Sequence, residues 1–179
     1  MEKITITEAL SEINLIKKKV ITKQSKIEGA LIRAEHLPDP FLTEGGSEEM
    51  IKREYQGLRD LNRRLQTIRA KISLANLSNE ITVEDETRSI HDWLIWKREI
   101  SADQIKFTHR VHTAIAGHMK TAGTQPQVFK DAEDKVKLVQ YKVNIDYAEW
   151  LQRHTVLSER LEKLDGKLSL KNATIVLEI

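Results

Sequence analysis

The feature that most constrains this fold is a heptad pattern of apolar residues in three long stretches. At residues 13–34, 51–75 and 147–168, apolar side chains recur at alternating steps of three and four. That spacing is typical of a helix whose apolar stripe packs along a second helix. The low content of Gly (seven), Pro (three) and aromatic residues (5%) also favours long helices. We therefore predict a mainly α fold of long antiparallel coiled-coil helices.

Two loops separate the predicted helices. His36–Ser47 contains Pro38, Pro40 and the pair Gly45–Gly46, all of which end helices. Thr121–Asp134 forms the second loop. The first helix is expected to open at Thr7 with Glu8 and to reach Ala34, and the second to open at Ser47. The third helix is expected to open at Asp85 or Thr87 and to restart at a capping box of Ser101 with Gln104. The last helix is expected to be capped by Asn144 or Asp146.

Short runs of β-branched residues lie next to these helices. They predict strands at residues 3–6, 81–83, 135–143 and 174–179. We expect the strands to pair into one small β-sheet near the helix ends. The whole chain, 1–179, is interpreted as a single helical domain. Its segments are a first helical hairpin (1–78), a central helix with its loop (79–134), and a strand, long helix and terminal strand (135–179).

One helix end occurs twice in the chain. The stretch LNRRLQTIRAKISLAN at 61–76 is matched by LSERLEKLDGKLSLKN at 157–172, and each runs on into a β-branched segment. We interpret the repeat as architectural, with both helices ending at one end of the molecule. A chance match between two heptad helices is the alternative.

Four stretches, taken in order, resemble a known family. They are ITEALSEI (6–13), ISLANLSNEITVEDETRSIHDWLIWKREI (72–100), VKLVQYKVNIDYAEWLQ (136–152) and LEKLDGKLSLKN (161–172). Their order is similar to that of the septicolysin-like family of small helical proteins from bacteria and their phages. The resemblance implies a helical hairpin with a small sheet and a ring-like homo-oligomer of six. The family's name also implies a pore-forming activity.

The sequence contains no recognisable catalytic motif. There is no Cys, which excludes disulfides and thiolate metal sites, and no phosphate-loop, dinucleotide-binding, zinc-protease or nucleophile-elbow motif is present. We therefore expect a protein that is not an enzyme and binds no cofactor.

Three histidines on one predicted helix are the group that most resembles a metal site. His109 and His112 lie one turn apart, His118 follows, and Asp103 lies about two turns back. The alternative, which we favour, is a solvated basic face shared with neighbouring Lys and Arg residues, with no metal. His154 falls on the apolar stripe of the last helix and is expected to be a hydrogen-bonded core residue.

Two charged residues interrupt the apolar stripes. Lys23 and Glu54 occupy heptad positions on the first and second helices. Antiparallel packing allows an ion pair between them, and the alternative is that both lie where the stripe is open to solvent.

Five residues are candidates for a subunit interface. The third helix carries apolar residues on more than one side, and the last strand has an edge that needs a partner. The candidates are Trp93, Trp96, Ile100, Ile175 and Leu177. We expect a homo-oligomer, with six chains favoured by the resemblance.

Charge and hydropathy limit the partners. The net charge of +2 gives no strong field for nucleic acid, so nucleic-acid binding is a minor alternative. No apolar run approaches the length of a membrane span, and the N-terminal residues do not form a signal peptide. We expect a non-catalytic, self-assembling structural or adaptor protein of the cytoplasm or of a virion, in a tailed-phage particle with other particle proteins as possible partners. The alternative is a pore-forming protein, which rests on the resemblance alone.

Overall fold

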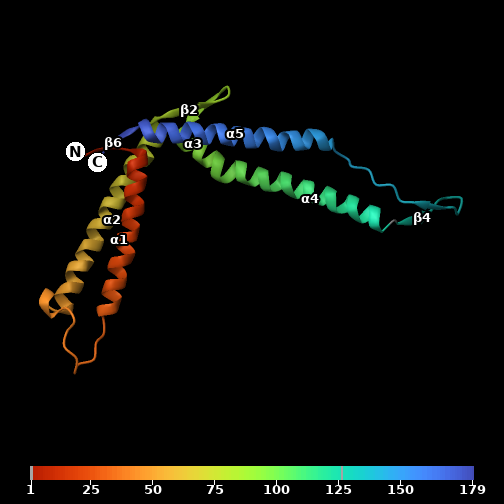
Figure 1. The fold of residues 1–179 in the computed structure, drawn as a ribbon. Coiled ribbons are helices and arrows are strands. Elements are labelled where there is room, and N and C mark those ends of the chain that lie inside the picture. Colours follow the sequence, from red (N-terminus) through yellow and green to blue (C-terminus); the bar gives the residue numbers. More distant parts are fainter. Residues whose placement is uncertain (1, 126) are drawn as a thin grey trace. The chain divides into compact units, whose positions relative to one another are not determined.

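The computed structural model describes residues 2–125 and 127–179 and is mainly helical (Figure 1). Contacts between backbones divide the chain into two compact units. Unit 1 comprises Met1–Glu80 and Leu168–Ile179, and unit 2 comprises Ile81–Lys167. The units do not follow the three predicted segments, because the C-terminal part of the last helix belongs with the first hairpin. Two compact units can belong to one folding domain, so the single domain stays a prediction.

The elements alternate between short strands and long helices. Unit 1 holds β1 (Lys3–Thr5), α1 (Ile6–Ala30), a 3-10 turn (Leu42–Glu44), α2 (Ser47–Ser78) and β6 (Val176–Glu178). Unit 2 holds nearly all of β2 (Glu80–Val83), β3 (Glu86–Ser89), α3 (Ile90–Ile95), a π-helical turn (Trp96–Ser101), α4 (Ala102–Thr124), β4 (Val128–Lys130) and β5 (Val136–Leu138). The last helix, α5 (Tyr147–Thr174), runs from unit 2 into unit 1.

The first helix begins directly after β1 at a capping box. The Thr5 hydroxyl accepts a hydrogen bond from the Glu8 N–H (3.2 Å), and the Glu8 carboxylate accepts one from the Thr5 N–H (2.7 Å). These bonds lower the pKa of Glu8, with the Thr5 backbone as the main cause. The predicted start at Thr7 is therefore two residues late. The helix also ends at Ala30 rather than at Ala34.

The loop between α1 and α2 is organised by one carboxylate. Asp39 accepts hydrogen bonds from the Ser47 N–H (2.8 Å), the Ser47 hydroxyl (2.7 Å) and the Phe41 N–H (2.9 Å). These donors lower its pKa to about 2. Gly45 and Gly46 have φ of 93° and 90°, a backbone conformation that glycine adopts without strain. The predicted loop is thus confirmed, and α2 begins at Ser47 as expected.

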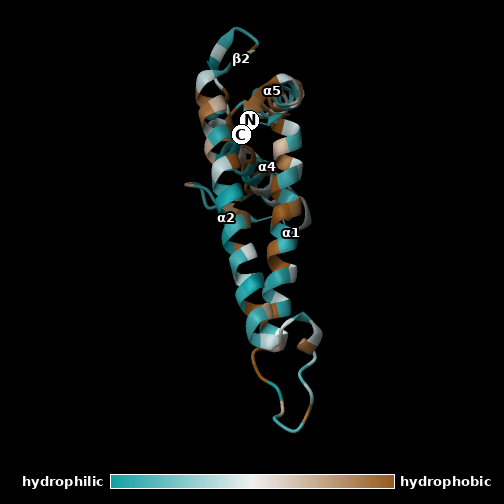
Figure 2. Cartoon of the chain, turned by 90° about the vertical axis from the view of Figure 1, so that its left-hand side faces the viewer, coloured by the Kyte–Doolittle hydropathy of each residue, from teal (hydrophilic) through white to brown (hydrophobic). Residues whose placement is uncertain are grey.

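The α1 and α2 helices lie side by side and run in opposite directions (Figure 1). The buried residues of α1 are spaced by three and four, as the heptad pattern requires. Figure 2 shows hydrophobic residues interspersed along both helices among mostly hydrophilic ones. The core of unit 1 consists of Ile6, Ala9, Ile13, Ile16, Ile68, Ala75 and Leu177.

The described strands form three two-stranded sheets rather than the one sheet predicted from the sequence. β1 pairs antiparallel with β6, β2 with β3, and β4 antiparallel with β5. The prediction missed β3 because its residues, ETRS, have no apolar alternation. Glu84, with φ of 59°, lies in the turn that brings β3 back onto β2. The third helix therefore begins at Ile90 rather than at Asp85 or Thr87, with Ser89 as its N-cap.

The two units are built on the same plan. Each contains a strand, a pair of long helices, and a closing strand from the other half of the chain: β6 closes unit 1 and β2 closes unit 2. Buried residues occupy corresponding positions in the two units. The pairs are Ile6 and Ile90, Ala9 and Trp93, Ile68 and Leu164, and Leu177 and Ile81.

A matching ion pair supports this correspondence. Arg64 on α2 pairs with Glu2 just before β1 (2.6 Å), and Arg160 on α5 pairs with Glu86 at the start of β3. Arg64 and Arg160 hold the same place in the repeated helix end. These shared positions favour the architectural interpretation of the repeat over a chance match. As that interpretation predicts, the end of α2 and the strand after α5 meet in one core, through Ala75 and Leu177.

The core of unit 1 can be tested by placing a charge in it. Ile68→Asp buries a carboxylate without a partner, so the free energy of unfolding is expected to fall by on the order of 4 kcal/mol. Gln66→Asp adds the same charge on an exposed side of α2 and is expected to change it by less than about 0.5 kcal/mol. Urea denaturation followed by circular dichroism measures both. Equal effects of the two substitutions would show that α2 does not pack through Ile68.

Candidate functional site

The five predicted interface residues differ in exposure. Trp93 (0% exposed) and Trp96 (7%) are buried in unit 2. Leu177 is buried in the core of unit 1, and Ile175 is packed against that core. These four side chains are covered within their own unit and offer little surface to another subunit. Ile100 is 47% exposed, so its place at an interface stays a prediction.

The two buried tryptophans form the centre of unit 2. The Trp93 indole N–H donates a hydrogen bond to the Ile81 carbonyl on β2 (2.8 Å). Trp96 packs edge-on against Trp93, with ring centroids 5.5 Å apart and planes at 87°. Their role is to hold β2 and α3 together, as expected for aromatic residues whose polar atom is satisfied inside a core.

Arginine links this aromatic pair to the C-terminal helix. The Arg160 guanidinium lies 5.2 Å from the Trp93 ring and 5.3 Å from the Trp96 ring, distances typical of cation–π contacts. Glu86 accepts hydrogen bonds from Arg88 and Arg160, and these bonds, the Arg88 bond above all, lower the pKa of Glu86. The charged groups are paired with one another, so this cluster is a structural junction.

A π-helical turn follows the aromatic cluster. Ser101 is buried and its hydroxyl donates to the Lys97 carbonyl (2.8 Å), so the predicted capping box of Ser101 with Gln104 does not form. A π-turn adds a residue to the helical repeat, which rotates the apolar stripe of the following helix. Ile95, just before the turn, and Ile100, within it, are both exposed.

The α4 helix is the least covered long helix of unit 2. None of its described residues is buried, although α5 lies alongside it. Phe107 on α4 and Trp150 on α5 meet edge to face, with centroids 5.7 Å apart, inside a groove of about 640 Å³. The Trp150 indole N–H is buried there without an acceptor in the described part of the chain.

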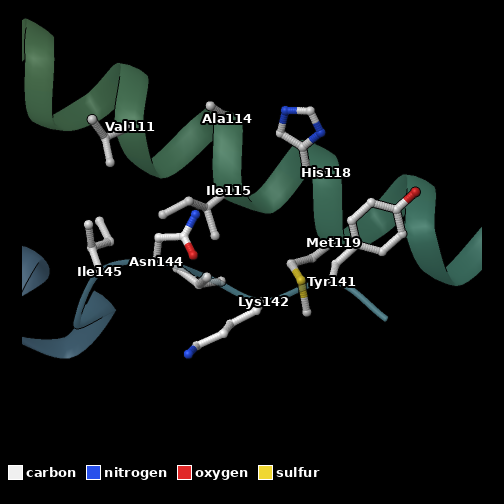
Figure 3. A pocket seen from close by; sticks show the side chains of 10 residues that line it. Val111, Ala114, Ile115, His118, Met119, Tyr141, Lys142, Asn144 and Ile145 are labelled. Atoms are coloured by element: carbon white, nitrogen blue, oxygen red, sulfur yellow. The ribbon is translucent and has the colours of Figure 1, made fainter. Parts of the chain in front are cut away.

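A second recess lies further along α4, between this helix and the extended segment 141–145 (Figure 3). Its volume is about 350 Å³. The α4 side is formed by Val111, Ala114, Ile115, His118 and Met119. Its lining is mostly carbon, so it suits an apolar surface rather than a charged metabolite.

The β4–β5 hairpin lies between α4 and the extended segment 141–145 in the sequence. Every residue of both strands is exposed, including Val128, Phe129, Val136 and Leu138. Sequence reasoning placed β4 inside the loop Thr121–Asp134 and so missed the hairpin. The strand predicted at 135–143 forms only at Val136–Leu138 (β5), and this run was the signal that a partner strand was needed.

The three histidines that were weighed as a metal site are not gathered around one point. His109, His112 and His118 are exposed on α4. The His112 ring stacks on Tyr147, with centroids 5.7 Å apart, and its Nδ1 shares a hydrogen bond with the Tyr147 hydroxyl. Within residues 2–125 and 127–179, no group of three His, Asp or Glu side chains could hold a metal ion. His154 is half-buried on α5.

Of the two alternatives for Lys23 and Glu54, the structure shows the ion pair. Glu54 is buried between α1 and α2 and accepts hydrogen bonds from Lys23 (2.5 Å) and Lys26 (3.2 Å). These bonds, mainly that from Lys23, lower the pKa of Glu54. Gly57 leaves room for the lysine, since a Cβ there would lie 3.0 Å from the Lys23 Nζ. The surrounding surface is basic, with Lys18 and Lys19 beside the pair.

Comparison of the chain with protein-family models, with curated proteins and with solved structures gave no match. Among the described residues, no helix has both the length and the apolar character needed to cross a membrane.

The Glu54 ion pair predicts a pH dependence. The pKa of folded Glu54 lies below its ordinary value of 4.5, so its stabilisation is present above about pH 4.5 and is lost as the pH falls through the folded pKa. Glu54→Gln is expected to lower the free energy of unfolding by about 1–2 kcal/mol at pH 7, and this effect is expected to shrink as the pH falls below about 4.5. The control Glu28→Gln changes an exposed carboxylate and is expected to be neutral at both pH values. Thermal unfolding across this pH range measures the difference, and a Glu54→Gln effect independent of pH would contradict the assignment.

Proposed function

We propose that this chain is a non-catalytic, self-assembling structural or adaptor protein. The observation that carries the proposal is its exposed surface of 13,057 Å². A compact monomer of 20.7 kDa exposes roughly 8,900 Å². The observed 13,057 Å² exceeds this value by about 4,100 Å², an area within the range that permanent subunit interfaces bury. Assembly with further copies is the direct way to cover it.

The α1–α2 pair would act as a stiff arm in such an assembly. We propose that it is an antiparallel coiled coil. The supporting observations are the three-four spacing of the buried residues of α1 and the ion pair of Glu54, which is buried on α2. A buried charged group in such a stripe fixes the register of the helices at some cost in stability.

The shifted carboxylates support a structural role. Glu8 and Asp39 hold a helix start and a loop, while Glu54 and Glu86 are paired with basic side chains. Each shift thus has a partner that explains it through local structure, whereas a catalytic site needs an ionisable group poised for a substrate.

We extend the proposal to a ring of six chains that forms part of a tailed-phage particle. This extension rests on the order of the four sequence stretches that resemble the septicolysin-like family. In that setting the protein would work in the cytoplasm or in the virion, through contacts with its own copies and with other particle proteins.

Self-assembly is tested by measuring the mass in solution. Light scattering coupled to gel filtration, at tens of micromolar protein, is expected to give a mass several times that of the 20.7 kDa chain, with six times favoured. A mass equal to that of one chain would overturn the proposal. Dye release from liposomes by the same preparation would favour the pore-forming alternative.

A further inference from the structure

The β4–β5 hairpin is the exception among the three sheets of the described chain. The other two sheets bury side chains against helices, through Leu177 on β6 and through Ile81 and Val83 on β2. No residue of β4 or β5 is buried. An isolated two-stranded hairpin is only marginally stable in water and gains stability from further strands or from a helix packed against it.

The register places the aliphatic residues of the hairpin on one face. Val128 lies opposite Leu138, and Lys130 lies opposite Val136. Residues opposite each other in an antiparallel pair share a face, and neighbours along a strand alternate. Three aliphatic side chains, Val128, Val136 and Leu138, therefore point to the same side, and each is at least 60% exposed.

The hydrogen bonds identify the free edge groups. The Val139 N–H bonds to the Gln127 carbonyl (2.9 Å), and the Asp131 N–H bonds to the Lys135 carbonyl (3.0 Å). Inward- and outward-facing backbone groups alternate along each strand. The backbone groups of Val136 and Leu138 consequently face outward on β5.

The two edges of the hairpin differ in protection. On β4 the outward positions are Val128 and Lys130, and a lysine at an outward position of an edge strand discourages pairing with another chain, although Lys130 pairs with Asp134 (2.9 Å). On β5 both outward positions are aliphatic. The intervening Lys137 is held by an ion pair with Asp131 (2.6 Å) of its own hairpin. A recess of about 690 Å³ also runs beside β5.

We propose that the β5 edge docks the β5 strand of a second copy of this chain in antiparallel fashion, with a two-fold axis through Lys137. This proposal rests on the proposed function and assigns one surface to the assembly. The pairing places Val136 opposite the Leu138 of the second copy, and Leu138 opposite its Val136. Two hairpins then form one four-stranded sheet with a continuous aliphatic face.

A second copy fits this edge for two reasons. An antiparallel pair around a two-fold axis is self-complementary, so each outward N–H and C=O of one β5 meets its counterpart on the other. The two Lys137 side chains would be neighbours, but each is already neutralised by its own Asp131.

A charge on the edge tests the surface. Leu138→Lys is expected to weaken self-association by about tenfold or more, because it replaces an aliphatic side chain at the contact with a charged one. Leu74→Lys is the matched control, since Leu74 and Leu138 are both 62% exposed and Leu74 lies on α2. Light scattering over a dilution series measures association, and circular dichroism establishes that both variants are folded.

A cross-link tests the register independently of stability. The chain has no Cys, so a single introduced Cys reacts only with its copy in a second chain. In the proposed pairing, position 137 faces itself at a non-hydrogen-bonded site, where Cα atoms are about 4.5 Å apart and a disulfide can form. Lys137→Cys is expected to give a covalent dimer on mild oxidation, and Phe129→Cys on β4 is expected to stay uncross-linked.

The outcomes separate the two proposals. A wild-type oligomer that keeps its mass in Leu138→Lys, with no cross-link in Lys137→Cys, would overturn the β5 surface while self-assembly stands. Cross-linking of Phe129→Cys instead would assign the contact to β4 and overturn the proposal. A wild-type chain of single-chain mass would overturn self-assembly itself, and the β5 contact with it.

Discussion

The structure depends on the closing of each helical hairpin by a strand that comes from the other half of the chain. In unit 1 this strand is β6, and Leu177 fills the space among Ile6, Ala9 and Ile68. In unit 2 it is β2, whose Ile81 is buried and offers its carbonyl to Trp93. A pair of long helices alone buries only one stripe on each helix. The strand adds the residue that closes the end of the stripe. The segment from β1 to α2 therefore needs β6 to complete its core, and the segment from β3 to α5 needs β2.

One difference between corresponding residues of the two units accounts for much of the difference in how their helices are covered. The position held by Ala9 in unit 1 is held by Trp93 in unit 2, and both side chains are fully buried. A small residue lets α1 approach α2 closely, and the apolar stripe stays covered beyond Ile16. The larger indole, with Trp96 and the π-turn after it, fills the equivalent space in unit 2. The α4 helix then leaves its side chains in contact with solvent.

The sequence predicted those features that arise from local periodicity. The α2 helix follows from heptad spacing, the first loop from Pro and Gly positions, and the terminal strand from its β-branched run. Heptad spacing allowed the Glu54 ion pair without deciding it. The sequence could not predict β3, because four polar residues become a strand only when β2 is beside them. Nor could the sequence decide whether Trp93 lies in a core or at an interface, since an apolar helix face looks the same whether its cover comes from the same chain or from another.

The open surface of α4 and of the β4–β5 hairpin would make the stability of this part of unit 2 depend on assembly. The α4 helix and the β4–β5 hairpin bury little within their own unit, so few apolar contacts oppose their local opening. A partner that binds only the folded form stabilises it in proportion to its occupancy. The closed core around Leu177 in unit 1 needs no such help. If copies assemble through unit 2, the distal half of that unit gains stability with protein concentration, while unit 1 keeps the same stability at every concentration.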